Sequence, residues 1–195
     1  MLIKIRSLVS NSDYFGIYDN ALSKKECEII INQFEKSEHH PGLIWFDGMR
    51  QEVPDYKKCI TLQDTTFDDG SVITNIVRPQ LTKCLQRYNF EQPQLIDLGY
   101  WNLDNEYVVQ KYETEEDGYK DWHCEHALGG ESRIMAWMFY LNNAKSGTEF
   151  RNYPTVGAKM GRCAIWPSGW THVHRGGTPN KGLKYIVTGW ISYLE

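Results

Sequence analysis

The chain is 195 residues long, which fits one large domain that can bury roughly 70% of its unfolded surface. It is 41% hydrophobic and 13% aromatic, so a packed globule is expected and a disordered chain is excluded. The formal net charge is −4, and no run of Lys and Arg is longer than two residues. A broad basic surface for non-specific binding to nucleic acid is therefore not expected.

The five cysteines are odd in number and form no CxxC pair, which argues against a structural zinc site or a redox dithiol. Scattered single cysteines are typical of reduced thiols in intracellular proteins. The first twenty residues contain no apolar stretch of signal-peptide length, and no segment approaches the length of a membrane span. A cytoplasmic location without membrane contact is the expectation.

Two helices are predicted in the first half of the chain. Residues 23–26 (SKKE) have the form of a capping box, and apolar residues follow them at helical spacing. This helix should end before the breaker at 39–42 (HHPG). A second helical pattern covers about 71–88 and contains Pro79, which predicts a kink or two short helices. Residues 43–66 are irregular, and we expect an edge strand or a loop over the mouth of a barrel there.

From about residue 95 the pattern changes to short strands separated by Gly, Asn and Pro turns, which is typical of a sandwich or a jelly roll. Residues 106–112 alternate, and residues 134–141 form an apolar run typical of a central strand covered on both faces. Residues 162–166 and 184–194 are also strand-like.

The expected fold class is therefore mainly β with N-terminal helices. We expect a single domain, 1–195, in which a helix-rich support, 1–94, precedes a catalytic core, 95–195. That core is predicted to be a double-stranded β-helix, or jelly roll.

The main candidates for metal ligands are His123, Glu125 and His174. Alternate side chains of an extended strand share a face, so His123 and Glu125 should project together while Cys124 turns away. A histidine from a second strand would complete a face of two imidazoles and one carboxylate. That face leaves coordination positions open on non-heme Fe(II), which is the condition for binding a co-substrate and oxygen.

Lys184 opens the last predicted strand and should share an inward face with Ile186, Thr188 and Trp190. Burying a lysine is costly unless an anion meets it. No acidic side chain is an obvious partner in the sequence. A co-substrate that carries a carboxylate would supply one, in a charge-assisted bond worth about 1.5–3 kcal/mol.

An ordered set of motifs runs through the second half of the chain. In chain order they are Tyr112, Gly118-Tyr119, His123-Cys124-Glu125, Tyr140-Leu141-Asn142, Gly147-Thr148-Glu149-Phe150, and His174 with Lys184 ten positions later. This set resembles the 2-oxoglutarate- and Fe(II)-dependent dioxygenases, specifically the prolyl 4-hydroxylase-like branch. Residues 18–27 also look like the opening helix of that family, so the resemblance spans most of the chain. The family usually has Asp where this chain has Glu125, which puts metal affinity and geometry in question at that position.

The resemblance implies Fe(II) ligands at His123, Glu125 and His174. It also implies that Lys184 pairs with the distal carboxylate of 2-oxoglutarate. The family spacing of ten residues before the lysine selects His174 over the competing His172.

Tyr112, Tyr140 and Thr188 match family positions that line the co-substrate pocket. For Tyr140 the alternative is a plain aromatic of a core strand. Trp190 matches an inward position of the last strand, where a core role is the expectation. His126, one position beyond the metal ligand, should face away from the site.

The implied activity is 2-oxoglutarate- and Fe(II)-dependent hydroxylation of a C–H bond by O2, with succinate and CO2 as co-products and ascorbate as a candidate reductant. The resemblance favours a peptide or protein substrate, with proline as the first candidate, and a small molecule or a nucleotide is the alternative. A catalytically degenerate jelly-roll binding module is the alternative from another functional class. Nucleic acid as a macromolecular partner is not expected.

Overall fold

A seven-stranded antiparallel sheet organises the part of the chain that the computed structural model describes, namely residues 13–62, 66–126, 130–177 and 182–194. Residues 1–12, where no signal peptide is expected, lie outside this part. Along the chain the elements are β1 (Gly16–Tyr18), α1 (Lys24–Glu35), β2 (His39–Pro41), β3 (Ile44–Phe46), β4 (Met49–Gln51), β5 (Lys57–Lys58), β6 (Ile60–Leu62), α2 (Val72–Glu91), the 3-10 helix η2 (Pro93–Leu98), β7 (Trp101–Tyr112), β8 (Gly118–Tyr119), β9 (Arg133–Tyr140), β10 (Thr148–Phe150), β11 (Cys163–Pro167), the 3-10 helix η3 (Trp170–His172), β12 (His174–Gly176) and β13 (Lys184–Tyr193).

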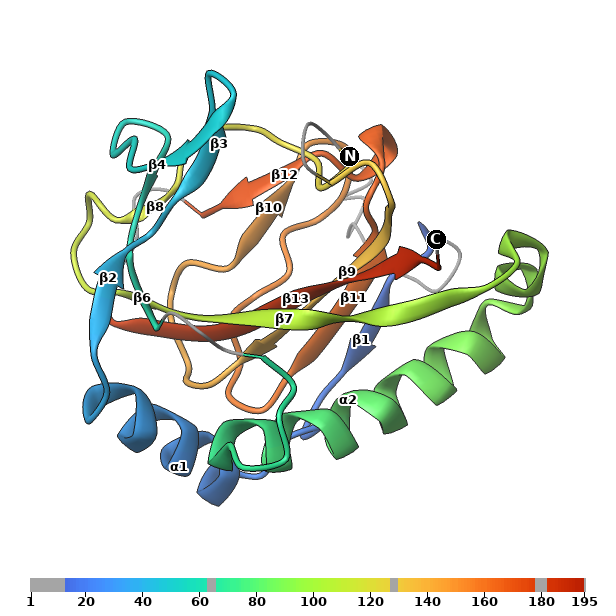
Figure 1. The fold of residues 1–195 in the computed structure, drawn as a ribbon, viewed down its shortest axis with the longest axis horizontal. Helices are drawn as coiled ribbons and strands as arrows, with labels where there is room; N and C mark the ends of the chain where they lie inside the picture. The colour runs from blue at the N-terminus through green and yellow to red at the C-terminus, as the bar shows by residue number, and fades with distance from the viewer. Residues whose placement is uncertain (1–12, 63–65, 127–129, 178–181, 195) are drawn as a thin grey trace, which may run out of the picture.

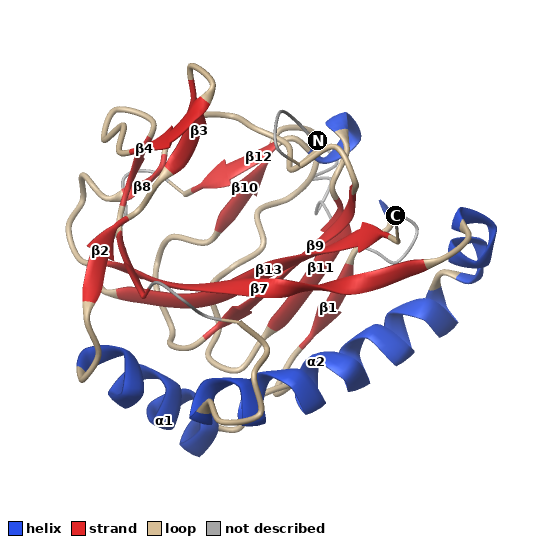
Figure 2. Ribbon diagram, viewed as in Figure 1, coloured by secondary structure: helices blue, strands red, loops and turns tan. Residues whose placement is uncertain are grey.

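The large sheet has the strand order β1-β11-β9-β13-β7-β6-β2. Helices α1 and α2 lie along one side of it, and the small pairs β10-β12, β3-β4 and β5-β8 lie on the other side (Figures 1 and 2). The strands predicted from residue 106 onward are confirmed as β7, β9, β11 and β13. Among the described helices, none is long and apolar enough to cross a membrane.

Helix α1 begins at the predicted capping box. The Ser23 hydroxyl accepts a hydrogen bond from the Glu26 backbone N–H, and the Glu26 carboxylate accepts one from the Ser23 backbone N–H. Such a cap stabilises a helix by about 1 kcal/mol. The apolar face of α1 buries Cys27, Ile30 and Phe34 against the large sheet.

Helix α2 is one helix, so the alternative of two short helices is wrong, and Pro79 neither divides the helix nor ends it. Residues Val72–Glu91 form one helix, which Figure 1 shows as a continuous ribbon. Proline removes the hydrogen bond to the carbonyl four residues earlier. Here Pro79 and Asn75 both lie on the exposed side of the helix, so water can satisfy that carbonyl. Val77 and Leu81 on the opposite side are fully buried under the sheet and hold the helix in place.

The large sheet separates two apolar clusters. On β13, Tyr185 and Val187 join the cluster under the helices, whereas Ile186 joins a second cluster with Tyr140 and Phe150 on the other side. Alternation along an extended strand accounts for this division. The inward face predicted for the last strand therefore points away from the helices and lines a cavity between the large sheet and the small ones.

The irregular region 43–66 contains the β3-β4 hairpin and strand β6, which pairs with β7 in the large sheet. Asp47 and Gly48 join β3 to β4 and have φ angles of 50° and 79°. An Asp-Gly turn with both φ angles positive matches the twist of a hairpin. Ile44 and Trp45 of this hairpin line the mouth of the cavity.

Candidate metal centre

Three side chains predicted as metal ligands meet in the cavity. His123, Glu125 and His174 each offer one ligand atom, and these atoms all lie within 4.8 Å of one another. Oε1 of Glu125 is 3.3 Å from Nε2 of His174 and 3.8 Å from Nε2 of His123. The described residues contain no other such group of three.

Backbone pairing between distant segments brings the two histidines together. The His123 N–H donates to the His174 carbonyl at 3.0 Å, and the His174 N–H donates to the His123 carbonyl at 2.8 Å. This is an isolated bridge, so the expectation that His123 and Glu125 lie on a regular strand is wrong. Cys124 is also part of the cavity wall, and its Sγ lies 3.6 Å from the His126 carbonyl. Without a ladder on both sides, the strict alternation of a strand does not apply.

The outer nitrogen of each imidazole is occupied by a backbone carbonyl. Nδ1 of His123 lies 2.9 Å from the Asp121 carbonyl, and Nδ1 of His174 lies 3.0 Å from the His172 carbonyl. A carbonyl only accepts, so each Nδ1 carries a proton, and the Nε2 of a neutral imidazole in this tautomer presents a lone pair. Donation from the outer nitrogen is the arrangement that orients a metal-binding histidine.

Ring contacts hold the two imidazoles in these orientations. His123 stacks on Tyr119 with ring centroids 3.6 Å apart and an interplanar angle of 14°. His174 lies against the rings of Phe150 and Trp166. Both imidazoles are therefore fixed by packing as well as by hydrogen bonds.

Electrostatics keeps the donor atoms in the forms that bind a cation. Burial lowers the pKa of His123 to about 3, so this imidazole is neutral at physiological pH. Burial opposes ionisation of Glu125, but the neighbouring side chains of His174, His123 and Arg133 hold the pKa of its carboxyl well below the usual range. An ionised carboxylate therefore faces two lone pairs, an arrangement that a divalent cation stabilises.

The second oxygen of Glu125 is held on the side away from the histidines. The Trp190 indole N–H donates to Oε2 at 2.8 Å, and Nη1 of Arg133 lies 3.6 Å from the same atom. Trp190 packs against the apolar cluster on the cavity side, as expected, and its indole also lines the cavity and contacts a candidate ligand.

Lys184 lies in the same cavity and is only 3% exposed. Its partner across the strand pair is Tyr112, and Nζ lies 4.6 Å from the centre of that ring. Among the described residues none forms an ion pair or a hydrogen bond with this Nζ. Burial lowers the pKa of Lys184 to about 8, so the side chain is mainly charged at neutral pH. A buried cation without an ion-pair partner is costly and suits an anionic ligand.

The three remaining residues predicted to bind the co-substrate all line the cavity, and each hydroxyl has a protein partner. Tyr112 donates to Oε1 of Gln110 at 2.7 Å, and the Tyr140 hydroxyl lies 2.6 Å from the Thr148 hydroxyl. Burial raises the pKa of Tyr140 to about 12, so its phenol keeps its proton. Thr188 donates to a backbone carbonyl of β9 at 2.8 Å.

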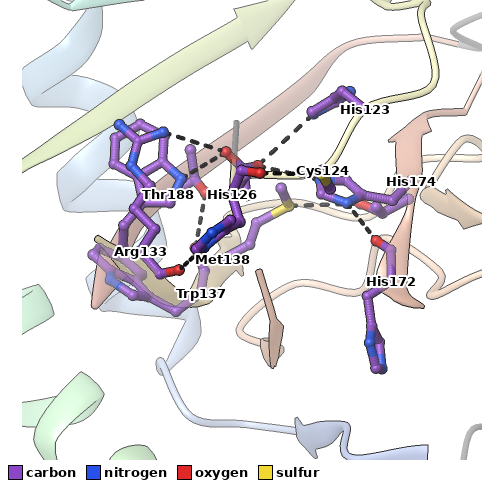
Figure 3. A network of polar contacts seen from close by, with 12 residues as sticks. His123, Cys124, His126, Arg133, Trp137, Met138, His172, His174 and Thr188 are labelled. Atoms are coloured by element: carbon purple, nitrogen blue, oxygen red, sulfur yellow. Dashed lines mark hydrogen bonds and ion pairs between the residues drawn. The ribbon is translucent and has the colours of Figure 1, made fainter. Parts of the chain in front are cut away.

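Two other histidines lie apart from the cluster. Nε2 of His172 is 2.9 Å from the Asp13 carbonyl, and the His172 ring stacks on Tyr153. Figure 3 shows the His172 side chain pointing away from His174. Nδ1 of His126 is 3.0 Å from the Arg133 carbonyl, so this ring is engaged outside the cluster as well.

The comparisons with known proteins agree with this geometry. Residues 107–192 match the family model of the 2OG-Fe(II) oxygenase superfamily. This region, which holds all three candidate ligands, belongs to the 2OG-Fe(II) oxygenase superfamily. A search among curated proteins finds no significant match.

Solved structures of prolyl hydroxylases share the fold of this 2OG-Fe(II) oxygenase. One from Trichoplax adhaerens, in complex with a peptide fragment of the hypoxia inducible factor oxygen degradation domain, has a TM-score of 0.72 at 14% identity, with 94% of this chain and 85% of that chain covered. A prolyl-4-hydroxylase from Pseudomonas putida has a TM-score of 0.66 at 13% identity, with 95% of each chain covered.

The viral collagen prolyl hydroxylase of Paramecium Bursaria Chlorella virus-1, in its 2OG complex, has a TM-score of 0.60 at 16% identity, with 95% of this chain and 98% of that chain covered. At these identities the likeness shows the fold. The predicted fold class, mainly β with N-terminal helices around a double-stranded β-helix, is confirmed.

Fe(II) and 2-oxoglutarate are the metal and the co-substrate that this superfamily implies, and the residues of the 2OG-Fe(II) oxygenase fit both. Two neutral imidazole nitrogens and one carboxylate oxygen form a donor set suited to Fe(II). The dianionic co-substrate would meet the cationic Lys184 in the same cavity.

Several cavity residues of the 2OG-Fe(II) oxygenase were not found from its sequence. Gln110 shares the alternating face of Tyr112, and that pattern was a sufficient signal for its position. Thr148 belongs to a quoted motif, but nothing in the motif indicates a bond to Tyr140. Arg133 opens β9 outside any motif, so only its position in the folded chain reveals it.

Proposed function

We propose that this 2OG-Fe(II) oxygenase hydroxylates a peptide substrate, with peptidyl proline as the first candidate. His123, Glu125 and His174 hold the iron, and Lys184 pairs with the distal carboxylate of 2-oxoglutarate. The observation that carries the proposal is that these four side chains line one cavity of about 570 Å³.

Bound iron and 2-oxoglutarate, with O2, supply the oxidising chemistry that places one oxygen atom in a C–H bond and releases succinate and CO2. The residues of the chain supply position and charge. The histidines present neutral nitrogens, and Glu125 presents an anionic oxygen between them. Lys184 orients the co-substrate within the cavity, because a charge-assisted bond fixes direction as well as affinity.

The other cavity residues shape the co-substrate end. Tyr112 lies under the ammonium group of Lys184, while the hydroxyls of Tyr140 and Thr148 form a hydrogen-bonded pair in the same cavity. Thr188 has its hydroxyl proton committed to the backbone, so its oxygen is left to accept. We assign Tyr112, Tyr140 and Thr188 to the lining of the 2-oxoglutarate pocket.

The mouth of the cavity supports a peptide rather than a compact ligand. The β3-β4 hairpin extends over it, and Trp45, Phe46 and Met49 of that hairpin are 53%, 40% and 58% exposed. Exposed aromatic and Met side chains are typical of surfaces that contact peptides. The similar Trichoplax adhaerens enzyme was solved with a peptide, which agrees with this assignment by analogy of fold.

The test is to incubate the protein with Fe(II), 2-oxoglutarate, ascorbate, O2 and a panel of proline-containing peptides. Mass spectrometry should find a peptide that gains one oxygen atom, with one succinate formed for each hydroxylated peptide. The His174→Ala variant is the control and should give neither product.

Two outcomes would contradict the peptide assignment. Succinate formation stimulated by a small molecule or a nucleotide, but by no peptide, would favour the alternative substrates. A wild-type protein that binds neither metal nor 2-oxoglutarate would favour a catalytically degenerate binding module.

A further inference from the structure

We propose that Trp190 and Arg133 form a carboxylate clamp that makes Glu125 a one-oxygen ligand. The clamp holds Oε2 and leaves Oε1 alone to face the two histidines. This inference rests on the proposed metal site and assigns positioning roles to two residues that do not themselves bind the metal.

The two oxygens of Glu125 have separate partners. Oε2 accepts the Trp190 indole N–H at 2.8 Å and lies 3.6 Å from Nη1 of Arg133. Oε1 lies 3.3 Å from Nε2 of His174 and 3.8 Å from Nε2 of His123. One carboxylate oxygen of Glu125 therefore faces the two histidines, and the other faces Trp190 and Arg133.

Arg133 and Trp190 also hold each other. The guanidinium carbon of Arg133 lies 3.7 Å from the centre of the Trp190 ring, which is a close cation–π stack. A planar guanidinium stacks in this way and a lysine ammonium does not. The stack fixes the indole so that its N–H points at Glu125, and it brings the positive charge to the same oxygen.

Hydrogen bonds through Ser168 connect Arg133 of the clamp to the segment that carries Glu125. The Ser168 carbonyl accepts the backbone N–H groups of Glu125 and His126 at 3.0 and 3.1 Å. The carbonyl of Arg133 in turn lies within hydrogen-bonding distance of the Ser168 hydroxyl and of Nδ1 of His126. Glu125 and Arg133 are thus anchored to a common point, and His126 acquires a structural role.

The length of the Glu125 side chain explains what this clamp does. Glutamate has one methylene more than aspartate, so its carboxylate has one more rotatable bond and can turn both oxygens toward a cation. A two-oxygen contact would occupy a coordination position that a co-substrate or O2 needs. Holding Oε2 at Trp190 and Arg133 removes that option and restores the function of a shorter carboxylate.

The test uses anaerobic titration with Co(II), whose visible absorption reports coordination number as well as affinity. Trp190→Phe keeps the ring that Arg133 stacks on and removes the N–H donor. Arg133→Met keeps the apolar stem and removes the charge. Each variant should bind Co(II) about tenfold or more weakly, as the loss of a residue that orients a ligand commonly does. The intensity of the visible bands should also change.

Matched controls separate the clamp from general packing. Trp137→Phe removes a buried indole whose N–H has no hydrogen-bond partner among the described residues, on the helix side of the sheet. Arg151→Met removes a guanidinium that stacks on Trp122 at 5.2 Å without contacting Glu125. Both controls should keep wild-type Co(II) affinity and absorption, whatever they do to the melting temperature.

A double-mutant cycle with Glu125→Asp tests the link to ligand length. The shorter side chain cannot reach both the histidines and Trp190, so Glu125→Asp should weaken Co(II) binding in this chain. Adding Trp190→Phe to Glu125→Asp should then weaken Co(II) binding by less than a further threefold, because the contact between residues 125 and 190 is already lost.

The outcomes are distinguishable from failure of the proposed function. The metal site itself is refuted if the wild-type protein binds no Co(II), or if the His174→Ala variant binds Co(II) as tightly as the wild type does. Wild-type binding with unchanged affinity and spectra in both Trp190→Phe and Arg133→Met refutes the clamp. A lower melting temperature of the metal-free variants with unchanged Co(II) affinity also refutes it, because that result describes packing alone.

Discussion

On strand β13, residues that face the helices alternate with residues that face the cavity, and the two sets have different roles in folding and binding. Tyr185 and Val187 are buried against apolar neighbours under α1 and α2. Lys184 and Thr188 are turned to the cavity, where polar and charged groups collect. The helix-facing residues gain stability from burial, at about 1.5–3 kcal/mol for each large apolar side chain.

The cavity-facing residues carry a cost instead. Burial lowers the pKa of both Lys184 and His123, which means that the charged forms are disfavoured where they lie. An anionic ligand can recover that cost for Lys184, whereas His123 avoids the cost by staying neutral. The contrast predicts that changes on the helix side mainly alter folding, whereas changes on the cavity side mainly alter binding.

The largest effect is expected when a metal ligand is removed. His174→Ala should weaken binding of a divalent metal by at least about 100-fold, because a direct ligand matters more than a residue that only orients one. Equilibrium dialysis with Mn(II) under anaerobic conditions measures this. His172→Gln is the matched control on the same segment and should bind metal as the wild type does. Equal loss in both variants would contradict the assignment of His174.

On the helix side, Phe139→Ala should lower the free energy of unfolding by about 3–5 kcal/mol, because the side chain is fully buried in the core under the helices. Urea denaturation measures the change. The neighbouring Met138→Ala removes a half-buried side chain on the cavity side and should cost clearly less. Equal destabilisation by the two substitutions would remove the contrast between the faces.

Replacing the buried cation tests both sides of the contrast together. Lys184→Met should weaken 2-oxoglutarate binding about 10- to 100-fold, since a charge-assisted bond worth about 1.5–3 kcal/mol is lost. The metal-free protein should become more stable, because a buried charge that has no ion-pair partner in the described part of the chain is replaced by an apolar side chain. Calorimetric titration and thermal unfolding measure the two effects. A destabilised Lys184→Met protein with unchanged 2-oxoglutarate affinity would show that the lysine is structural.

The smallest effect is a pH dependence. The pKa of Lys184 in the ligand-free protein is lowered to about 8, so the ammonium form is complete below that pH and is lost above it. Affinity for 2-oxoglutarate should therefore be level up to about pH 8 and fall by up to tenfold for each further pH unit. Lys184→Arg should remove this fall, because the guanidinium stays charged. An identical decline in both proteins would assign the titration to another group.

Local patterns in the sequence determined the elements of the fold and most members of the site. The capping box at Ser23 predicts α1, and period-two alternation predicts that Lys184 and Thr188 share the cavity face. These signals are local, because capping depends on residues three apart and strand faces depend on residues two apart. The motif order from Tyr112 to Lys184 also indicated the superfamily.

The tertiary structure decided which contacts form between segments that are distant in the sequence. The backbone bridge of His123 to His174 replaces the regular strand that alternation predicted, and Pro79 is tolerated because its side of α2 meets water. The Trp190 hydrogen bond and the Arg133 ion pair to Glu125 join three segments that no periodicity relates. Contacts of this kind depend on how elements pack across the cavity, which a one-dimensional pattern does not encode. The sequence thus determined which residues could form a metal site, and the packing of the sheets determined how its carboxylate is held.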